Sequence, residues 1–437
     1  MDKQNQLEYL NNVKEDLNAI GPGFCVLKWY HQEINLAEGQ NHSCYHCPQH
    51  KIPLKGDLHN TPHKVEQRKI MLEGGKPDEC SYCWDIEKIP GLISDRQILH
   101  HQFHKNDPNV IASAVADGLN PVYPRYLEVS FTNKCQMSCS YCSTSKSSSW
   151  QKEIDKYGPY ELTQRSNALQ YFSRKDSMYD DNKNPYIKKF WTWFPEAYEH
   201  LFVLRVTGGE PLLDKNTFRL LEHVKKNPRK DLEFQINTNL MVSEKRVLRY
   251  IDLVKDQNKN KLYVSIDSWG KQAEWIRHGL DIDIFEENLL KILANGIHVG
   301  FMITFCLLSI PKISELIFKV AEWKNQFPGQ ITFDAPYMVE PYHLTARIAD
   351  ENLISKLESS LKDMELYVDE KIYLTSEYER YKKSVEWIKN NLFTGDVLEN
   401  HRKDFVKFVD EHDRRRGTNW HDSFPEMEQF YQKILKK

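Results

Sequence analysis

The stretch Cys135-Gln136-Met137-Ser138-Cys139-Ser140-Tyr141-Cys142 places three thiols in one short segment, directly after an apolar, strand-like run at residues 127–131. Thiolates are soft ligands that suit iron–sulfur clusters and zinc. A closed structural zinc site needs four protein ligands, whereas three cysteines on a four-iron cluster leave one iron open to another ligand. The segment therefore predicts a metal centre with an open coordination position. A zinc knuckle or three buried thiols are the alternatives.

Length and composition indicate an ordinary globular protein. The chain has 437 residues, enough for two or three domains, with 40% apolar residues, 28% charged residues and a formal net charge of -3. This charge lacks the basic excess typical of nucleic-acid-binding proteins. Residues 1–16 contain no apolar segment of a signal peptide, and the most apolar stretch, residues 296–310, is too short to span a bilayer. We expect a cytoplasmic protein without membrane contact.

From about residue 120 onward, short apolar runs alternate with amphipathic segments. The predicted strands are 127–131, 202–206, 232–236, 262–266, 298–305 and 330–334. The predicted helices are 190–201, 217–226, 244–254, 285–294 and 313–323. This alternation predicts a parallel sheet wrapped by helices, and six repeats predict a partial (β/α)6 TIM-like barrel over residues 120–345. The polar insertion at residues 143–188 is expected to cover the barrel mouth.

The flanking regions differ from the barrel in composition. Residues 1–115 contain five of the nine cysteines, and a helix is predicted over residues 62–72 because Thr61 can cap it and Pro62 suits its first turn. Residues 24–30 are a candidate strand. Residues 346–437 are charged and helical in pattern and carry no chemical motif. Arg414-Arg415-Arg416 within them suits an anionic substrate, but the helix dipole alone favours basic residues at a helix end, and we prefer that interpretation.

In a barrel of this type the catalytic groups lie in the loops that follow the strands. The second strand leads into Thr207-Gly208-Gly209-Glu210-Pro211, where glycines allow close backbone approach and Glu210 can accept from an ammonium. The third strand ends in Asn237-Thr238-Asn239 and the fourth in Ser265-Ile266-Asp267-Ser268. Such side chains bind ribose hydroxyls and carboxylates, although they are also ordinary loop residues.

The C-x3-C-x2-C spacing of residues 135–142, with Tyr141 before the last cysteine, resembles the signature of the radical S-adenosylmethionine (radical SAM) superfamily. The resemblance implies a 4Fe-4S cluster on Cys135, Cys139 and Cys142 whose open iron binds the methionine end of SAM. The reduced cluster would then cleave SAM to methionine and a 5′-deoxyadenosyl radical that abstracts hydrogen from a substrate.

The same resemblance assigns the other strand-end residues to parts of SAM. Gly-Gly-Glu-Pro resembles the motif for the methionine amino group, and the ends of the third and fourth strands correspond to the ribose and methionine portions. Tyr141 corresponds to the adenine position, and Arg277 to an arginine that pairs with the SAM carboxylate. The implied SAM-binding residues are Tyr141, Gly208, Gly209, Glu210, Pro211, Asn237, Asn239, Ser265, Asp267 and Arg277.

The N-terminal cysteines resemble a twitch (half-SPASM) module, which binds one auxiliary 4Fe-4S cluster. The resemblance rests on Cys25, on Gly39 ahead of Cys44, and on the pair Cys80 and Cys83. The order departs from the resembled enzymes, in which the module follows the barrel. A structural zinc on Cys44, Cys47, Cys80 and Cys83 is the alternative. If the module binds a cluster, Cys47 is either spare or an alternative fourth ligand.

These observations predict a radical SAM enzyme with an N-terminal auxiliary-cluster module and a helical C-terminal region. The expected partners are an unidentified peptide or small metabolite and a flavodoxin- or ferredoxin-type reductant. Cys306, in the fifth strand, is a candidate hydrogen donor, although a buried core cysteine is commoner. The alternatives are a zinc-stabilised nucleic-acid-binding protein and a noncatalytic iron–sulfur redox sensor.

Overall fold

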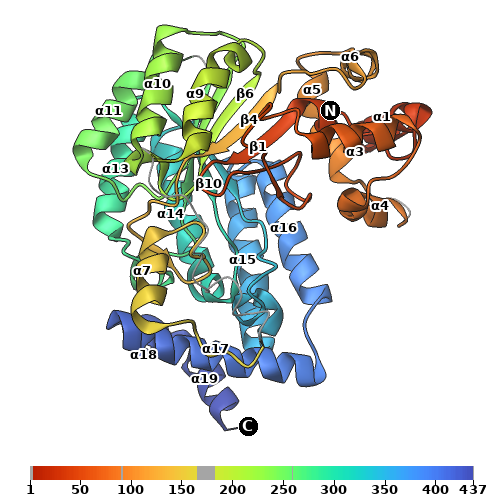
Figure 1. Cartoon of the computed structure of the whole chain (residues 1–437). Coiled ribbons are helices and arrows are strands. Elements are labelled where there is room, and N and C mark those ends of the chain that lie inside the picture. Colours follow the sequence, from red (N-terminus) through yellow and green to blue (C-terminus); the bar gives the residue numbers. More distant parts are fainter. Residues whose placement is uncertain (1–2, 90–91, 165–182, 258, 437) are drawn as a thin grey trace. The chain divides into compact units, whose positions relative to one another are not determined.

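The computed structural model of the chain describes residues 3–89, 92–164, 183–257 and 259–436 (Figure 1). The fold is mixed α/β, with a mostly parallel central sheet and a helical C-terminal region. The chain forms two compact units. The first comprises residues 1–132, 178–206 and 230–234, and the second comprises residues 133–177, 207–229 and 235–437. Of the predicted insertion at 143–188, residues 165–182 lie outside the described part of the chain.

The first unit contains the helices of the cysteine-rich N-terminal region. They are α1 (Lys3–Ile20), α2 (Leu27–Tyr30), α3 (Pro62–Leu72), α4 (Ser81–Glu87), α5 (Asp95–His104) and α6 (Val110–Asp117), with α9 (Pro185–Tyr198) added from later in the chain. The predicted helix at 62–72 is confirmed as α3, and Thr61 Oγ1 accepts from the Lys64 N–H at 3.3 Å. Thr61 therefore caps the helix as the sequence predicts.

The strands of the first unit are β1 (His31–Asn35), β2 (Gln40–His42), β3 (His50–Lys51), β4 (Tyr126–Ser130) and β6 (Val203–Thr207), in the order β6-β4-β1-β2-β3. Strand β1 runs parallel to β4, and β2 runs antiparallel to β1. The predicted strand at 24–30 is wrong, because α2 occupies part of it and the strand begins at His31. The sequence His-Gln-Glu-Ile-Asn is polar yet wholly buried, so its hydrophobic pattern gives no strand signal.

The second unit carries the remaining parallel strands, β7 (Glu233–Thr238), β8 (Asn260–Ser265), β10 (His298–Met302) and β11 (Ile331–Asp334), in the order β7-β8-β10-β11. Val299 of β10 lies opposite both Leu262 of β8 and Ile331 of β11. A separate two-stranded ladder joins β5 (Ser138–Cys139) to β9 (Arg277–His278). All six strands predicted over 120–345 are present, with ends shifted by a few residues.

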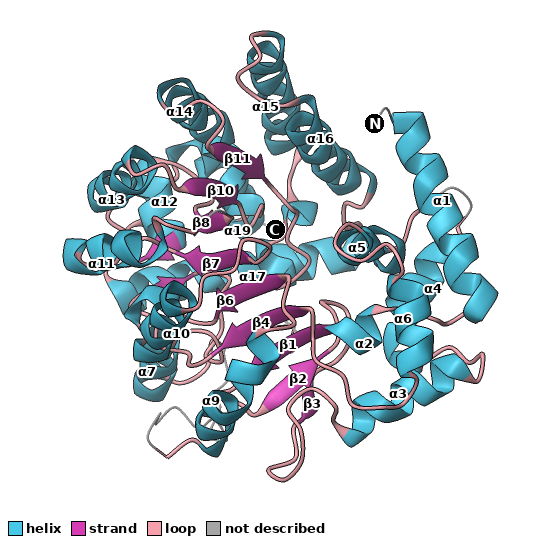
Figure 2. Cartoon of the chain, turned by 90° about the horizontal axis from the view of Figure 1, so that it is seen from above, coloured by secondary structure: helices cyan, strands magenta, loops and turns pink. Residues whose placement is uncertain are grey.

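Amphipathic helices follow these strands, as predicted. Four of them match predicted ranges: α10 (Lys215–Lys226), α11 (Glu244–Val254), α13 (Ile282–Ala294) and α14 (Ile313–Gln326). Two further helices, α7 (Ser148–Tyr157) and α12 (Gly270–Ile276), lie outside the predicted helix ranges. Figure 2 shows α11, α13 and α14 along the outer side of the strands of this unit. The Phe301 ring of β10 stacks on Trp323 of α14 with centroids 5.4 Å apart. The parallel sheet wrapped by helices is confirmed.

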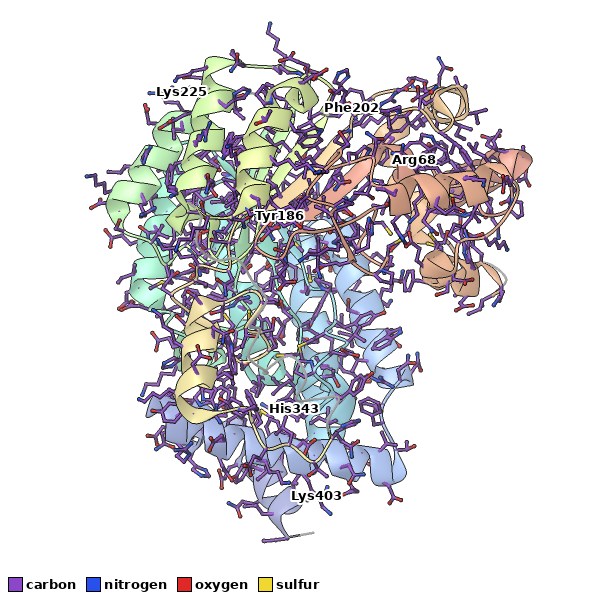
Figure 3. All side chains as sticks on the ribbon, in the orientation of Figure 1. Arg68, Tyr186, Phe202, Lys225, His343 and Lys403 are labelled. Atoms are coloured by element: carbon purple, nitrogen blue, oxygen red, sulfur yellow. The ribbon has the colours of Figure 1, made fainter. Side chains whose placement is uncertain are left out.

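The C-terminal region is helical, as expected. Its helices are α15 (Glu351–Asp369), α16 (Thr375–Asn390), α17 (Gly395–Arg416), α18 (Trp420–Ser423) and α19 (Glu428–Leu435). His343, just before α15, is fully buried and packs on Phe408 of α17 with ring centroids 5.0 Å apart (Figure 3). Across the described ranges, none of the helices has the length and apolar character needed to cross a membrane.

Candidate metal and cofactor site

The cysteine segment 135–142 is held by contacts on both of its sides. On one side, Cys139 pairs with Arg277 in the β5/β9 ladder, and the Ser140 N–H donates to the carbonyl of the residue before Arg277 at 2.7 Å. On the other side, the Trp150 indole of α7 donates to the carbonyl of Cys139 at 2.7 Å. The positions of the thiols therefore depend on helix α7 and on the turn that contains Arg277.

The three thiols border one cavity of about 210 Å³ together with the ends of successive strands. Thr207 ends β6, and Gly208 and Gly209 follow it; Asn237, Thr238 and Asn239 are at the end of β7; Ser265 ends β8. The remaining lining residues are Met137, Tyr141, Lys146, Arg277 and Thr304. Because parallel strands bring their carboxyl ends to one edge of a sheet, residues far apart in the chain meet here.

Burial is the main cause of the raised pKa values of Cys135 and Cys142. It raises the pKa of Cys142 to about 12, with a further contribution from the neighbouring Cys139. Burial and the adjacent thiols also raise the pKa of Cys135. Metal ligation requires thiolates, so loading this site would release protons. The donor set of three soft sulfurs beside a polar cavity fits a cluster with one open iron.

Gly209 permits the close approach of the β6 loop to the cysteine segment. A Cβ atom on Gly209 would lie 2.4 Å from the carbonyl oxygen of Lys134, which belongs to the backbone and cannot turn aside as a side chain can. The next residue, Glu210, donates its N–H to that same carbonyl at 2.8 Å. Gly208 has a φ of 125°, which L side chains rarely adopt. Both glycines are therefore required by geometry at this turn.

Glu210 and Pro211 are not among the cavity-lining residues. Glu210 is 2% exposed, and its carboxylate accepts from the N–H of Leu212 at 2.9 Å, the hydroxyl of Thr238 at 2.8 Å and the N–H of Asn239 at 2.7 Å. Burial raises the pKa of Glu210 to about 7, although these hydrogen bonds oppose the shift. The carboxylate thus joins the β6 loop to the end of β7 behind the cavity wall.

Asp267 lies at the centre of a buried network that includes two of the predicted cofactor residues. It is fully buried, and its carboxylate accepts from Tyr141 Oη at 2.7 Å and from the Thr304 N–H at 2.8 Å. Arg277 Nε forms an ion pair with it at 2.8 Å. Arg277 Nη1 also lies 3.7 Å from Cys139 Sγ. The guanidinium is therefore held beside a thiol that the sequence predicts to be a ligand.

Several cavity residues were not predicted from the sequence. Thr304 and Lys146 are the clearest, because both line the cavity and neither belongs to a motif used above. Thr304 lies two residues beyond the end of β10, and the rule that functional residues follow barrel strands would have identified it. Lys146 lies in the insertion at residues 143–188, which the sequence predicts to cover the barrel mouth, but no motif identifies this residue.

The five N-terminal cysteines meet around a second, smaller cavity in the first unit, with a volume of about 20 Å³. Cys47 Sγ lies 3.4 Å from Cys44 Sγ and 3.9 Å from Cys80 Sγ. Cys25 and Cys83 line the same cavity. The Zn–S distance of about 2.3 Å places tetrahedral sulfurs about 3.8 Å apart, which is close to the Cys47–Cys80 separation. Cys47 is part of this thiol cluster and does not lie apart from it.

Gly39 acts on the shape of the first unit and not on the thiols directly. Its φ is 62°, and a Cβ there would lie 2.1 Å from the ring of Tyr186, which Figure 3 labels. The Tyr186 hydroxyl in turn donates to the carbonyl of Ile52 at 2.9 Å. Glycine is therefore needed at this position because the β2 turn packs directly against α9.

Cys306 and the arginine run Arg414–Arg416 lie outside the cavity lining. Cys306 is fully buried just beyond β10, and burial raises its pKa to about 11. Arg416 donates to the carbonyl of Ser138 at 2.7 Å and pairs with Glu153 at 2.8 Å. Arg415 donates to the carbonyl of Gly158 at 2.8 Å. These two arginines bind the cysteine segment and α7, a role that neither sequence interpretation included.

Comparison with known proteins gives the identity of the central segment. The sequence model of the radical SAM superfamily matches residues 129–315. This segment is a radical SAM domain. GTP 3′,8-cyclase from Campylobacter lari is 22% identical to the chain over 226 residues, which are 50% of this chain and 56% of the relative. The chain thus spans little more than half the length of that curated relative.

Two solved structures resemble the chain containing this radical SAM domain. Streptococcus suis SuiB bound to S-adenosylmethionine has a TM-score of 0.40 and 10% identity, over 78% of this chain and 69% of that one. Native anSMEcpe with bound AdoMet has a TM-score of 0.33 and 14% identity, over 54% of this chain and 57% of that one.

Proposed function

We propose that the chain is a radical SAM enzyme that binds a 4Fe-4S cluster through Cys135, Cys139 and Cys142 and abstracts hydrogen from a substrate. The observation that carries this proposal is that three thiols of one segment border the same cavity as the ends of β6, β7 and β8. When bound, the reduced cluster supplies one electron to the sulfonium of SAM, which releases methionine and a 5′-deoxyadenosyl radical.

The residues of the cavity would bind and orient SAM. The backbone at Gly208 and Gly209 borders the cavity without side chains, which leaves room for the methionine portion. Asn237, Asn239 and Ser265 offer amide and hydroxyl groups for the ribose and methionine. Tyr141 would meet the adenine. Arg277 is the cavity's guanidinium and would pair with the SAM carboxylate while Asp267 holds it in place.

Glu210 and Pro211 would act indirectly on the amino group of SAM. Because the Glu210 carboxylate already accepts three hydrogen bonds within the protein, we propose that it fixes the loop of Gly208 and Gly209 against Asn239. A direct bond to the SAM ammonium would require one of these donors to move. The wall at this point is therefore shaped by a buried carboxylate.

The first unit would hold a second metal centre on its cysteines. We propose an auxiliary 4Fe-4S cluster with ligands drawn from Cys25, Cys44, Cys47, Cys80 and Cys83, which surround one cavity. Cys47 Sγ lies 3.4 Å from Cys44 Sγ and 3.9 Å from Cys80 Sγ, closer than two thiolates on different irons of one cluster, so Cys47 would have to move to serve as a ligand. Zinc is the competing occupant. A cluster with four protein ligands would transfer electrons and would not bind substrate directly.

The remaining partners follow from the chemistry. Cleavage of SAM consumes one electron, so the enzyme needs a one-electron donor, for which we propose a flavodoxin- or ferredoxin-type protein. The substrate would be a peptide or a small metabolite. Thiol clusters of this kind require a reducing compartment, and we propose the cytoplasm.

The test of this proposal is the production of 5′-deoxyadenosine. Anaerobically reconstituted protein, supplied with SAM and dithionite, is expected to release it, and Cys139→Ala is expected to abolish the release. Cys306→Ala removes a thiol that does not line the cavity. It is the matched control and should retain the release of 5′-deoxyadenosine. Iron, sulfide and zinc analysis accompanies each sample. Equal 5′-deoxyadenosine release by Cys139→Ala and the wild type would refute the proposed function.

A further inference from the structure

A buried lysine lies among the thiols of the first unit. Lys28, on α2, is 2% exposed, and its Nζ lies 3.4 Å from Cys47 Sγ. The same ammonium forms an ion pair with Glu79, the residue before Cys80. A lysine is rarely buried to this degree unless its charge is paired. Its partners here are one carboxylate and one thiol sulfur of the metal-binding cluster.

The surrounding residues fix both members of this ion pair. Arg68 of α3 is fully buried, and its Nε donates to the carbonyl of Lys28 at 2.9 Å (Figure 3). Glu79 is 13% exposed, and its second carboxylate oxygen lies 2.6 Å from His63 Nε2. These contacts hold the backbone of Lys28 and the carboxylate of Glu79, and the ammonium cannot turn to solvent without breaking its own contacts with Cys47 and Glu79.

A fixed positive charge at this distance affects the electronic state of a bound cluster. Each added electron makes a thiolate-ligated cluster more negative, and hydrogen bonds to its sulfurs together with nearby positive charge stabilise that reduced state. The effect is large only for charges that are close and shielded from water. Lys28 meets both conditions, and Glu79 partly offsets its charge.

We propose that Lys28 raises the reduction potential of the N-terminal cluster by an N–H···S hydrogen bond to Cys47, and that Glu79 lowers it. The proposal requires Cys47 to be a ligand of that cluster. The inference rests on the auxiliary cluster proposed above. It predicts opposite effects for two neighbouring side chains, which a general loss of packing would not produce.

The test is a potentiometric titration of the full chain followed by electron paramagnetic resonance. Cys135, Cys139 and Cys142 are replaced by Ala in every sample so that only the N-terminal cluster contributes. Lys28→Met is expected to shift the midpoint potential to a more negative value, and Glu79→Gln to a more positive one. Lys69→Met removes an exposed positive charge from α3 and is expected to leave the potential unchanged.

The outcomes separate the inference from the proposal on which it rests. If the protein contains zinc and no iron, the auxiliary cluster itself is refuted. If iron is retained and both variants keep the wild-type potential, or shift it in the same direction, the role of Lys28 is refuted while the cluster stands. If Lys28→Met does not fold, Glu79→Gln decides the inference by the sign of its shift. Retention of full iron content in Cys47→Ala would refute Cys47 as a ligand.

Discussion

At the scale of single residues, burial determines what each polar group in the radical SAM domain does. Glu210 and Asp267 are both carboxylates that follow barrel strands, and the sequence assigns both to cofactor binding. The structure places both behind the cavity lining, where they accept hydrogen bonds from the protein. A buried carboxylate must find such partners, so these two residues orient the groups that line the cavity.

Asp267→Asn is expected to destabilise the fold strongly. The change leaves Arg277 buried without its ion-pair partner, and loss of one member of a buried pair costs about 3–5 kcal/mol. Urea unfolding of the apoprotein measures the difference. Asp334→Asn is the control, because Asp334 pairs with Arg380 at a half-exposed position and such pairs contribute about 0–1 kcal/mol. Similar losses in the two variants would contradict this assignment.

His343 is expected to make the fold sensitive to mild acid. Burial and the nearby His401 lower the pKa of His343 to about 3 from 6.5. Between these values the unfolded state binds more protons than the folded state, so stability falls as pH decreases below 6.5. The loss from this group is about 1.4 kcal/mol per pH unit.

His343→Phe should reduce this acid sensitivity. The variant cannot take up the proton, and its ring can still pack on Phe408. Urea unfolding near pH 7 and near pH 5 measures the slope for the variant and the wild type. His298→Gln, at an exposed position of β10, should retain the wild-type slope. An unchanged slope in His343→Phe would show that other groups dominate.

At the scale of elements, helix α17 helps to position the cysteine segment of the same unit. Arg416, at its C-terminal end, contacts the carbonyl of Ser138 and the carboxylate of Glu153 on α7. The stacked rings of Trp275 and His412, 3.7 Å apart, join α12 to α17. The C-terminal helices therefore support both sides of the segment that carries the three thiols.

Arg416→Met is expected to weaken cluster loading without unfolding the protein. Loss of residues that orient metal ligands typically weakens metal binding by about 10–100-fold. Iron content after reconstitution with limiting iron, together with the circular dichroism spectrum, measures the effect. Arg414→Met is the control, because Arg414 is exposed and its ion pair is with Glu411 on its own helix. Equal iron uptake by the two variants would argue against a role for α17.

At the scale of the whole molecule, the two thiol clusters belong to different compact units. Cys80→Ala is therefore expected to remove about one cluster's iron while SAM binding is retained. Iron analysis and equilibrium dialysis with labelled SAM measure the two properties. Loss of SAM binding in this variant would show that the two metal sites depend on each other, and retention of all the iron would place Cys80 outside the ligand set.

The sequence by itself determined the succession of barrel strands and helices and the cysteine segment, because these depend on local patterns. Alternating apolar runs and amphipathic helices predict a parallel sheet, and the C-x3-C-x2-C spacing is complete within eight residues. The same alternation predicts the approximate positions of the strand ends. Strand β1 was missed because its buried residues are polar. It is stabilised by pairing with β4, which is distant in sequence, and with β2, where no strand was predicted.

Only the tertiary structure decided which side chains line the cavity and which support it. Ser265 ends one barrel strand and Glu210 follows another, yet Ser265 lines the cavity and Glu210 lies behind it. The position of Cys47 was also decided by the tertiary structure. The sequence does not show whether Cys47 belongs to the thiol cluster, and the fold places its Sγ 3.4 Å from Cys44 Sγ and 3.9 Å from Cys80 Sγ. Residue type and spacing fix the chemistry that is available, but burial and hydrogen-bond partners depend on chain segments that no local pattern specifies.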